Sequence, residues 1–340
     1  MIDAFRFGGG ENVAKVYSFA LSKLGVHSTV VATKIMDERY IDTLQQYGIE
    51  WLLFSDLVAQ LTKLSSTGRD DVILFLHTNR ALLKYITHLK RIIPRENVFY
   101  IQHLFYHPIK FKILSHLINT YVGNFIQITP RTERLVKKYI KIPVHFFPNF
   151  YIRKHSVYEY DEIRSIVRKK LGLGLREFVV TFSSFFKKGK GLEDFIQLTN
   201  DLSDYRIKFI IIGDGPERWR IMKTKKKNFL WLGLQSDVER FLIASDVFVF
   251  PSYAGEMLPM AVIEAISVGI PVVAYRNVIT EYLLPEDLLA EDYDSLKRKI
   301  ISLRNSDIRK WKYSKIFDLE FGIRRFQDIL GSKIVNTSKD

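Results

Sequence analysis

The chain of 340 residues is long enough for two ordinary domains of about 100–200 residues each. Hydrophobic residues make up 47% and charged residues 26%, a globular composition that excludes a mainly disordered chain. Because cysteine is absent, a disulfide scaffold, a thiolate metal site and a cysteine nucleophile are excluded. No apolar run reaches the roughly 18–20 residues of a membrane span, and no export signal stands at the start, so we expect a cytoplasmic protein.

The net charge is strongly basic and unevenly spread. Lys and Arg number 51 against 37 acids, which gives +14. Between Arg80 and Lys141, twelve Lys or Arg stand against two acids, Glu96 and Glu133. A basic segment of this kind favours an anionic partner, which can be a nucleic acid, an acidic membrane surface or a phosphorylated substrate.

The first half of the chain alternates short apolar runs with amphipathic stretches, which predicts strands and helices in turn. Only Met1–Phe7 precede a glycine-rich turn, so the first strand is expected to be very short. Strands are predicted at Val26–Thr33, Ile49–Phe54, Asp71–Leu76, Asn97–Gln102, Asn124–Ile128 and Pro143–Phe146, and helices at Glu11–Leu24, Glu38–Gln46, Arg80–Ile92, Pro108–Asn119 and Arg131–Ile140.

A second alternating series follows a polar connection that ends near Arg176. Its strands are continuous apolar runs, the pattern of a parallel sheet covered on both faces, so both halves are expected to be doubly wound α/β domains. A long helix is predicted at Asp307–Leu330, with Trp311, Phe317, Phe321 and Phe326 as apolar anchors. The strands are predicted at Phe178–Ser183, Lys208–Ile212, Phe229–Leu232, Val247–Phe250 and Pro271–Ala274.

Three glycine-rich turns follow predicted strands, where ligands of open α/β sheets bind. Gly8-Gly9-Gly10 opens a helix and suits a phosphate, although its spacing also fits a plain tight turn. Ser183–Gly191 is a cationic loop suited to a diphosphate, or else a solvated basic loop. Ile211–Pro216 is a strand end followed by a glycine-rich turn, a pattern that many α/β loops share and that alone indicates little about function.

The most specific stretch runs from Phe250 to Ala274. A buried strand ends, a loop holds Glu256, and a helix begins near Pro259, carries Glu264 and stops at Gly269. An unpaired acid among apolar residues is costly, so Glu264 indicates a function more than an incidental surface acid. Two acids at one strand end can bind sugar hydroxyls, and the free amides of the helix can meet an anion.

These motifs resemble the large family of retaining glycosyltransferases with the GT-B architecture, the Glu-x7-Glu family (glycosyl transferases group 1, family 4). The resemblance covers nearly the whole chain and is looser in the first half. The matching residues are Gly8-Gly9 with Glu11, Leu24-Gly25-Val26-His27, His77, His103, Pro148-Asn149, Lys190-Gly191, Gly213-Asp214-Gly215-Pro216, Leu232-Gly233, Ala244-Ser245-Asp246-Val247, Pro251-Ser252, Glu256, Glu264 and Gly269-Ile270-Pro271-Val272-Val273.

The resemblance implies two doubly wound Rossmann-like domains that face each other across a cleft. Residues 1–150 would form the acceptor-side domain and residues 151–310 the donor-binding domain. A terminal helix at 311–330 would pack back on the N-terminal domain. The implied enzyme moves a sugar from a nucleotide-sugar donor to a glycan or lipid-linked acceptor with retention, in cell-surface polysaccharide or glycolipid synthesis, without a cofactor or an obligatory metal.

The resemblance also implies roles for single residues. Glu256 would lie beside the donor sugar, His103 near the reacting centre, Lys190 at the diphosphate and Glu264 at the ribose. The family's usual Gly-Arg pair is replaced by Ser183-Ser184-Phe185 in this chain, so Lys187 or Lys188 is expected to supply that charge. The catalytic set is therefore Glu256, His103 and Lys190, and the donor-binding set is Gly8, Gly9, Ser184, Lys188, Gly213, Gly215, Leu234, Met257, Leu258, Pro259, Met260 and Glu264.

Other functions remain open on the sequence alone. The same fold serves sugar-nucleotide epimerases and non-catalytic partner subunits, although the presence of both Glu256 and Glu264 disfavours the non-catalytic role. Nucleic-acid binding rests only on the charge, since no recognition module is present, and we expect none. No histidine pair has metal-ligand spacing with a nearby carboxylate, so no bound metal is expected.

The basic segment is better explained by a membrane surface. Cations interleave with apolar residues from Tyr106 to Leu114, and more cations follow on the next predicted helix. Such elements suit an anionic leaflet, with Phe105, Tyr106 and Phe111 as candidates for apolar insertion, although a merely solvated face is the alternative. We therefore expect a peripheral protein on the inner face of the cell membrane. The cations are Lys110, Lys112, Arg131, Arg134, Lys137, Lys138 and Lys141.

Overall fold

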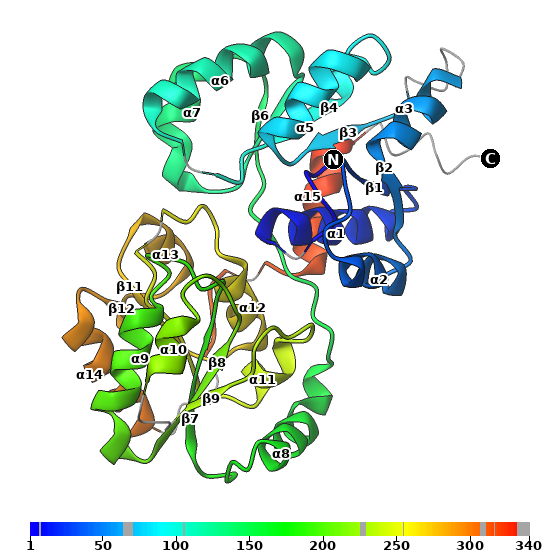
Figure 1. Cartoon of the computed structure of the whole chain (residues 1–340). Helices are drawn as coiled ribbons and strands as arrows, with labels where there is room; N and C mark the ends of the chain where they lie inside the picture. The colour runs from blue at the N-terminus through cyan, green and yellow to red at the C-terminus, as the bar shows by residue number, and fades with distance from the viewer. Residues whose placement is uncertain are drawn as a thin grey trace. The chain divides into compact units, whose positions relative to one another are not determined.

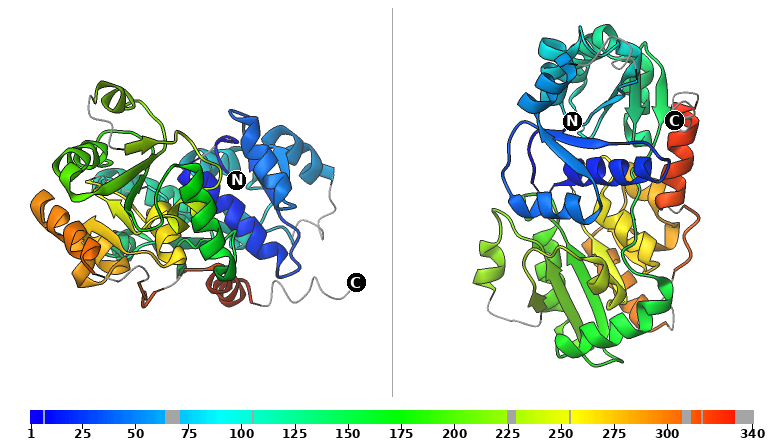
Figure 2. Two further views of the ribbon diagram at one scale, coloured as in Figure 1. Left: turned by 90° about the horizontal axis from the view of Figure 1, so that it is seen from below. Right: turned by 90° about the vertical axis from the view of Figure 1, so that its right-hand side faces the viewer.

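The computed structural model describes residues 1–6, 8–63, 71–104, 106–224, 229–253, 255–306, 311–315 and 317–331. Contacts divide the chain into two compact units. Both are α/β units with parallel sheets (Figure 1, Figure 2). Unit 1 consists of Met1–Ile152, Glu256–Leu258 and Phe317–Asp340, and unit 2 consists of Arg153–Gly255 and Pro259–Ile316.

Unit 2 contains a six-stranded sheet in the order β12-β11-β10-β7-β8-β9, with every neighbouring pair parallel. This is the arrangement of a doubly wound sheet: from β7 the chain first adds strands on one side and, from β10 on, adds them on the other. The strand order therefore reverses between β7 and β10. The continuous apolar runs predicted this parallel sheet correctly. Its strands are β7 (Phe178–Ser183), β8 (Ile207–Ile212), β9 (Phe229–Trp231), β10 (Val247–Phe250), β11 (Val272–Tyr275) and β12 (Leu289–Ala290).

Helices cover both faces of this sheet, which explains why its central strands are fully buried. Figure 1 shows α9 and α10 on one face and α11 and α12 on the other. The helices are α8 (Tyr160–Lys170), α9 (Leu192–Asp201), α10 (Trp219–Lys223), α11 (Glu239–Ile243), α12 (Met260–Val268), α13 (Val278–Leu283) and α14 (Tyr293–Arg304).

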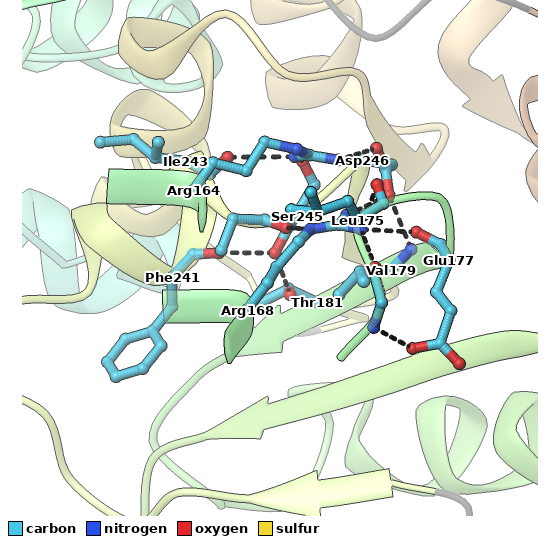
Figure 3. Close-up of polar contacts among 12 residues, drawn as sticks. Arg164, Arg168, Leu175, Glu177, Val179, Thr181, Phe241, Ile243, Ser245 and Asp246 are labelled. Carbon is cyan, nitrogen blue, oxygen red and sulfur yellow. Dashed lines mark hydrogen bonds and ion pairs between the residues drawn. The ribbon is translucent and has the colours of Figure 1, made fainter. Parts of the chain in front are cut away.

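A buried ion-pair network holds the amino ends of β7 and β10 together (Figure 3). Arg168 of α8 is fully buried, and its guanidinium donates to the carboxylate of Asp246 and to the carbonyls of residues 174, 175, 177 and 244. Asp246 also accepts from Arg164 at 2.6 Å and from the amide of Val179 at 2.8 Å. The network therefore joins the two strands that flank the reversal of strand order.

Unit 1 contains a sheet in the order β3-β4-β5-β6 and a parallel pair, β1 and β2. The segment Met1–Phe5 lies between them, because the amide of Ile2 donates to Val31 and the amide of His77 donates to Met1. It forms only isolated bridges, as expected for so short a first strand. The strands are β1 (Thr29–Ala32), β2 (Glu50–Leu53), β3 (Leu74–Leu76), β4 (Val98–Ile101), β5 (Asn124–Gln127) and β6 (Val144–Phe146).

The helices of unit 1 follow the predicted periodicity with shifted ends. The helix predicted at Arg80–Ile92 is instead α5 followed by a π-helical turn at Tyr85–Leu89. The helix that begins at Phe54 was not predicted. The helices are α1 (Gly9–Ser22), α2 (Glu38–Gln46), α3 (Phe54–Lys63), α5 (Asn79–Lys84), α6 (Pro108–Tyr121), α7 (Glu133–Tyr139) and α15 (Leu319–Leu330).

The last helix, α15, packs against α1 in unit 1 (Figure 1, Figure 2). The rings of Phe326 and Tyr17 meet edge to face at 5.0 Å, and Phe147 and Phe150 stack in the same cluster. A Cβ at Gly322 would lie 2.4 Å from the ring of Phe150, so glycine is required at this position of α15. The aromatic cluster thus joins the two ends of the chain in one core.

The prediction of one long helix over Asp307–Leu330 is wrong. The helix begins at Leu319, where the side chain of Asp318 caps it by accepting from the amide of Phe321. Trp311 and Tyr313 are not helical, because they are held by carbonyls of unit 2: the Trp311 amide donates to Gly269 and the Tyr313 hydroxyl to Ile270. Residues 307–310 and 316 lie outside the described part of the chain.

Candidate functional site

In unit 2 the loops that follow β7 and β10 touch at the point where the strand order reverses. The carbonyl of Gly189 accepts from the amide of Tyr253 at 2.8 Å and from the hydroxyl of Ser252 at 3.3 Å. Gly191 is the N-cap of α9 and has φ +83°. It sits so close to Pro251 that a Cβ on it would lie 2.2 Å from the carbonyl oxygen of Pro251. The sequence therefore places Lys190 between two glycines at the edge where a doubly wound sheet binds its ligand.

The loop after β8 lies against the loop after β7. Gly213 has φ +125°, and a Cβ on it would lie 1.9 Å from the carbonyl oxygen of Ser184. The amide of Phe186 donates to Asp214 at 2.9 Å, and the amide of Glu217 donates back to Phe186 at 3.0 Å. The two turns are thus held against each other by backbone contacts, with Ser184 and Gly213 in direct apposition.

The loop after β9 completes this edge of the sheet. The amide of Gly213 donates to the carbonyl of Gly233 at 2.8 Å, and the indole of Trp231 donates to the carbonyl of Gly213 at 2.9 Å. Leu234 is 60% exposed beside this contact. The structure therefore brings together the loops of the predicted donor-binding residues Ser184, Lys188, Gly213, Gly215 and Leu234.

Helix α12 follows β10 and carries Glu264. Pro259 is its N-cap and lacks an N–H, and the amide of Val262 donates to the Pro259 carbonyl, so the open amides at this helix end are those of Met260 and Ala261. Gly269 ends the helix in the left-handed region at φ +84°. Glu264 is half-buried in this mainly apolar helix.

The short loop Glu256–Leu258 belongs by its contacts to unit 1. Arg131 donates to the carbonyl of Glu256 at 3.3 Å, and the side-chain amide of Asn149 donates to the carbonyl of Leu258 at 3.4 Å. Met257 and Leu258 are buried. From the sequence, Arg131 was assigned only to the basic segment between Arg80 and Lys141. Its partner, Glu256, lies 125 residues away in the chain, and so distant a contact leaves no local signal.

In unit 1 the glycine turn lies at the corresponding reversal of strand order, between Met1–Phe5 and β3. Gly8 is the N-cap of α1, and a Cβ on it would lie 2.3 Å from the carboxylate of Glu11. Glu11 is buried and accepts from Arg6 at 3.0 Å. Gly8 and Gly9 thus sit at the amino end of α1, beside the buried carboxylate of Glu11.

His77 and His103 follow β3 and β4 and meet at this same edge. Nδ1 of His77 lies 3.0 Å from Nε2 of His103, and the two rings are nearly parallel at 8°. A Cβ at Gly10 would lie 3.7 Å from the His103 ring, so the glycine turn passes directly over this side chain. The structure thus places His103 beside the glycine turn, and sequence reasoning missed its bond to His77.

Burial keeps both imidazoles neutral near pH 7. It lowers the pKa of His103 from 6.5 to about 4, and it lowers the pKa of His77 well below its ordinary value, helped by the amino group of Met1 and by His103. The unfolded chain takes up these protons near pH 6.5, whereas the folded chain resists them. Unit 1 therefore loses stability as the pH falls from about 6.5 towards 4.

An aromatic pair borders the loop after β10. Tyr253 and Tyr275 stack at 4.8 Å, and both hydroxyls donate to the carboxylate of Asp194 at the start of α9. The two hydrogen bonds and the stacked rings hold in place the loop that leads to Glu256. No local pattern indicates this contact, since tyrosine and aspartate at these spacings are common on surfaces.

The described residues hold no group of three or more His, Asp or Glu side chains that could bind a metal ion. Within the same ranges, no helix is both long and apolar enough to cross a bilayer.

Comparisons with known proteins define the class of fold. Residues 163–315 match the family described as Glycosyl transferases group 1. HepE of Anabaena, solved in complex with UDP and glucose, aligns with a TM-score of 0.71 and 18% identity over 97% of this chain and 98% of its own. The chain therefore has the two-domain GT-B fold, as the sequence predicted, and the match to the group 1 family lies in its second half.

Two curated relatives match part of the chain. The alpha-galactosylglucosyldiacylglycerol synthase of Streptococcus pneumoniae is 32% identical over 142 residues, which are 38% of this chain and 37% of that enzyme. The UDP-Gal:alpha-D-GlcNAc-diphosphoundecaprenol alpha-1,3-galactosyltransferase of Escherichia coli is 41% identical over 69 residues, which are 18% of each chain. The chain thus spans well under half the length of these relatives.

Proposed function

We propose that this protein is a retaining glycosyltransferase that uses a nucleotide-sugar donor and a glycan or lipid-linked acceptor. The observation that carries the proposal is the meeting of the β7, β8 and β10 loops at the reversal point of unit 2, around Lys190 and the open end of α12. Glycine-rich turns, a cation and helix amides at the end of a strand suit a diphosphate. The two curated relatives, a glycolipid synthase and a lipid-linked galactosyltransferase, support the same class of reaction.

Each site residue has a role in this proposal. Glu264 binds the ribose, Glu256 contacts the donor sugar, and Lys190 stabilises the charge that grows on the leaving diphosphate. We assign His103, which stands beside the glycine turn of unit 1, to a contact with the donor sugar. The leaving diphosphate itself takes the acceptor proton on the front face, so positioning and cationic stabilisation supply the catalysis without an obligatory metal.

Replacing Lys190 with alanine is expected to weaken nucleoside-diphosphate binding and to slow transfer, each by about 10-fold or more, because a charge-assisted contact is lost. A panel of nucleotide sugars is first screened by thermal shift with the purified protein, and the best donor is then used in titration calorimetry and transfer assays. Lys169→Ala, an exposed cation of α8, is the matched control. Equal affinity in the Lys190 variant and wild type would contradict the diphosphate role.

The alternative functions give different results in the same screen. A sugar-nucleotide epimerase would interconvert the donor without any acceptor. A non-catalytic subunit would bind a donor and turn over nothing. A retaining transferase gives a product that keeps the anomeric configuration of the donor, which NMR of the product reads directly.

We further propose that unit 1 docks on an anionic membrane through its basic face, defined as the cations Lys110 and Lys112 of α6 and Arg134, Lys137 and Lys138 of α7. On α6, Ile109 and Ile113 are each 66% exposed, one turn apart, and the exposed Lys110 and Lys112 lie on the same helix. Phe111, a candidate for insertion if attachment did not depend on salt, is not available for that role, because its side chain is fully buried in the core of unit 1. Tyr106 packs partly buried against the same core, and Phe105 lies outside the described residues.

Neutralising the basic face is expected to release the protein from anionic vesicles while leaving binding of the soluble donor intact. Each cation near the surface contributes about 1 kcal/mol, and the attraction is screened within about 8–10 Å at physiological salt. Co-sedimentation of the unmodified protein should therefore fall steeply as salt rises. The variant replaces Lys110, Lys112, Arg134, Lys137 and Lys138 with glutamine.

The control replaces five exposed cations of unit 2 with glutamine and should leave attachment unchanged. If co-sedimentation with vesicles did not depend on the salt concentration, insertion of Ile109 and Ile113 into the bilayer would be indicated instead. No attachment at any salt would refute the membrane proposal. The five control positions are Lys169, Lys170, Arg176, Lys223 and Arg298.

A further inference from the structure

The His77–His103 contact joins two side chains of unequal exposure. His77 is 4% exposed, and its ring meets that of Tyr17 edge to face with centroids 5.6 Å apart, whereas His103 is partly exposed beside the glycine turn. The contact engages Nε2 of His103. Among the described residues no hydrogen bond to Nδ1 of His103 is found, and this is the nitrogen on the other edge of the ring.

A hydrogen bond between two neutral imidazoles requires one N–H and one bare nitrogen. The proton state of His77 Nδ1 therefore fixes that of His103 Nε2, and because a neutral ring carries one proton, it also fixes that of His103 Nδ1. His103 can change tautomer only if the bond breaks or if both rings change together. An isolated histidine has no such restriction.

We propose that His77 is a positioning residue that holds His103 in a single neutral tautomer, so that His103 presents Nδ1 in one defined state to a hydroxyl of the donor sugar. This role rests on the proposed function for its substrate, but the pairing itself does not. A sugar hydroxyl both donates and accepts, so a fixed tautomer selects one orientation of that hydroxyl and lowers the entropy cost of aligning it.

The surroundings of the pair favour neutral rings. Burial opposes a positive charge on both imidazoles. When protonated, the amino group of Met1 and the ring of His103 also oppose a charge on His77. Tyr17 of α1 contributes only its ring to this contact. The lowered pKa of about 4 for His103 agrees with a neutral pair through the ordinary working range of pH.

The test combines histidine ¹⁵N NMR with kinetics on three variants. In asparagine the amide group occupies the position of the His77 Nδ1, whereas the amide of glutamine reaches one bond farther and leucine has no polar atom. In wild type and His77→Asn, the ¹⁵N shifts of His103 should show one tautomer. In His77→Leu and His77→Gln they should show a mixture.

Kinetics then connect the tautomer with transfer. We expect kcat to fall about 10-fold in His77→Leu and His77→Gln with little change in the donor KM, and to recover in His77→Asn. If leucine prevents folding, the two amide variants still provide the comparison. A single His103 tautomer in His77→Gln or His77→Leu overturns the proposal even if transfer is confirmed, whereas absence of transfer in wild type with the expected NMR pattern refutes only the proposed function.

Discussion

Replacing Glu256 with glutamine is expected to lower kcat by about 10²–10³-fold while donor affinity changes little, because a charge that acts on the developing transition state is removed. Replacing Glu264 with alanine is expected to weaken donor binding by about 10–100-fold, since a charged group bonded to a ribose hydroxyl contributes about 1.5–3 kcal/mol. Steady-state kinetics and titration calorimetry with the same donor separate these two effects.

The control for both variants is Glu320→Ala, which removes an exposed acid of α15. A melting curve confirms that each variant is folded. If Glu256→Gln and Glu264→Ala both kept the kinetics of wild type, the transferase proposal would fail. If both only lowered affinity, Glu256 would be a binding residue and its role at the sugar would need another candidate.

Replacing Asp246 with alanine is expected to destabilise unit 2 by about 3–5 kcal/mol, because two arginines and a backbone amide lose their shared buried acceptor. Most of this loss is expected to come from Arg168 rather than Arg164, since the Arg168 guanidinium is fully buried and would keep an uncompensated charge. Chemical denaturation measures the free energy of unfolding. Thermal melting detects the same change as a lower Tm.

The matched control, Asp287→Ala, removes an exposed carboxylate of the same unit and should change stability by less than about 0.5 kcal/mol. A double variant, Arg168→Leu with Asp246→Leu, should recover part of the loss, because it removes the fully buried charge of Arg168, while Arg164 keeps its bonds to the carbonyls of Ile243 and Ser245. An Asp246 variant as stable as wild type would show that water satisfies Arg168 and would refute this view of the network.

The central strands and the edge that carries the candidate site were predictable because their signals are local. Continuous apolar runs bounded by glycine turns predict parallel strands, and Gly213 and Gly191 occupy positions where a Cβ would collide with neighbouring backbone. Glu264 was identified because an acid inside an apolar helix is costly, and the structure shows it half-buried there.

Other features depend on partners far away in the chain, and no local pattern reveals them. Arg168 belongs to a run of cations that looks like a solvated helix face, yet its partner Asp246 lies 78 residues away. The same reason hid the bond between His77 and His103, which are 26 residues apart. Phe111 was misjudged because cations surround it in sequence, although its position on α6 turns it into the core.

Because unit 1 combines residues before Arg153 with residues after Ile316, it cannot be completed until the whole of unit 2 has been synthesised. Tyr17, Phe147 and Phe150 leave the ribosome early, but Phe326, which covers them, follows after the whole of unit 2. At about 5–20 residues per second, the interval between Ile152 and Phe317 takes about 10–30 s. Throughout that time an aromatic surface of unit 1 stays uncovered, so chaperone engagement and early aggregation are expected to begin at this surface.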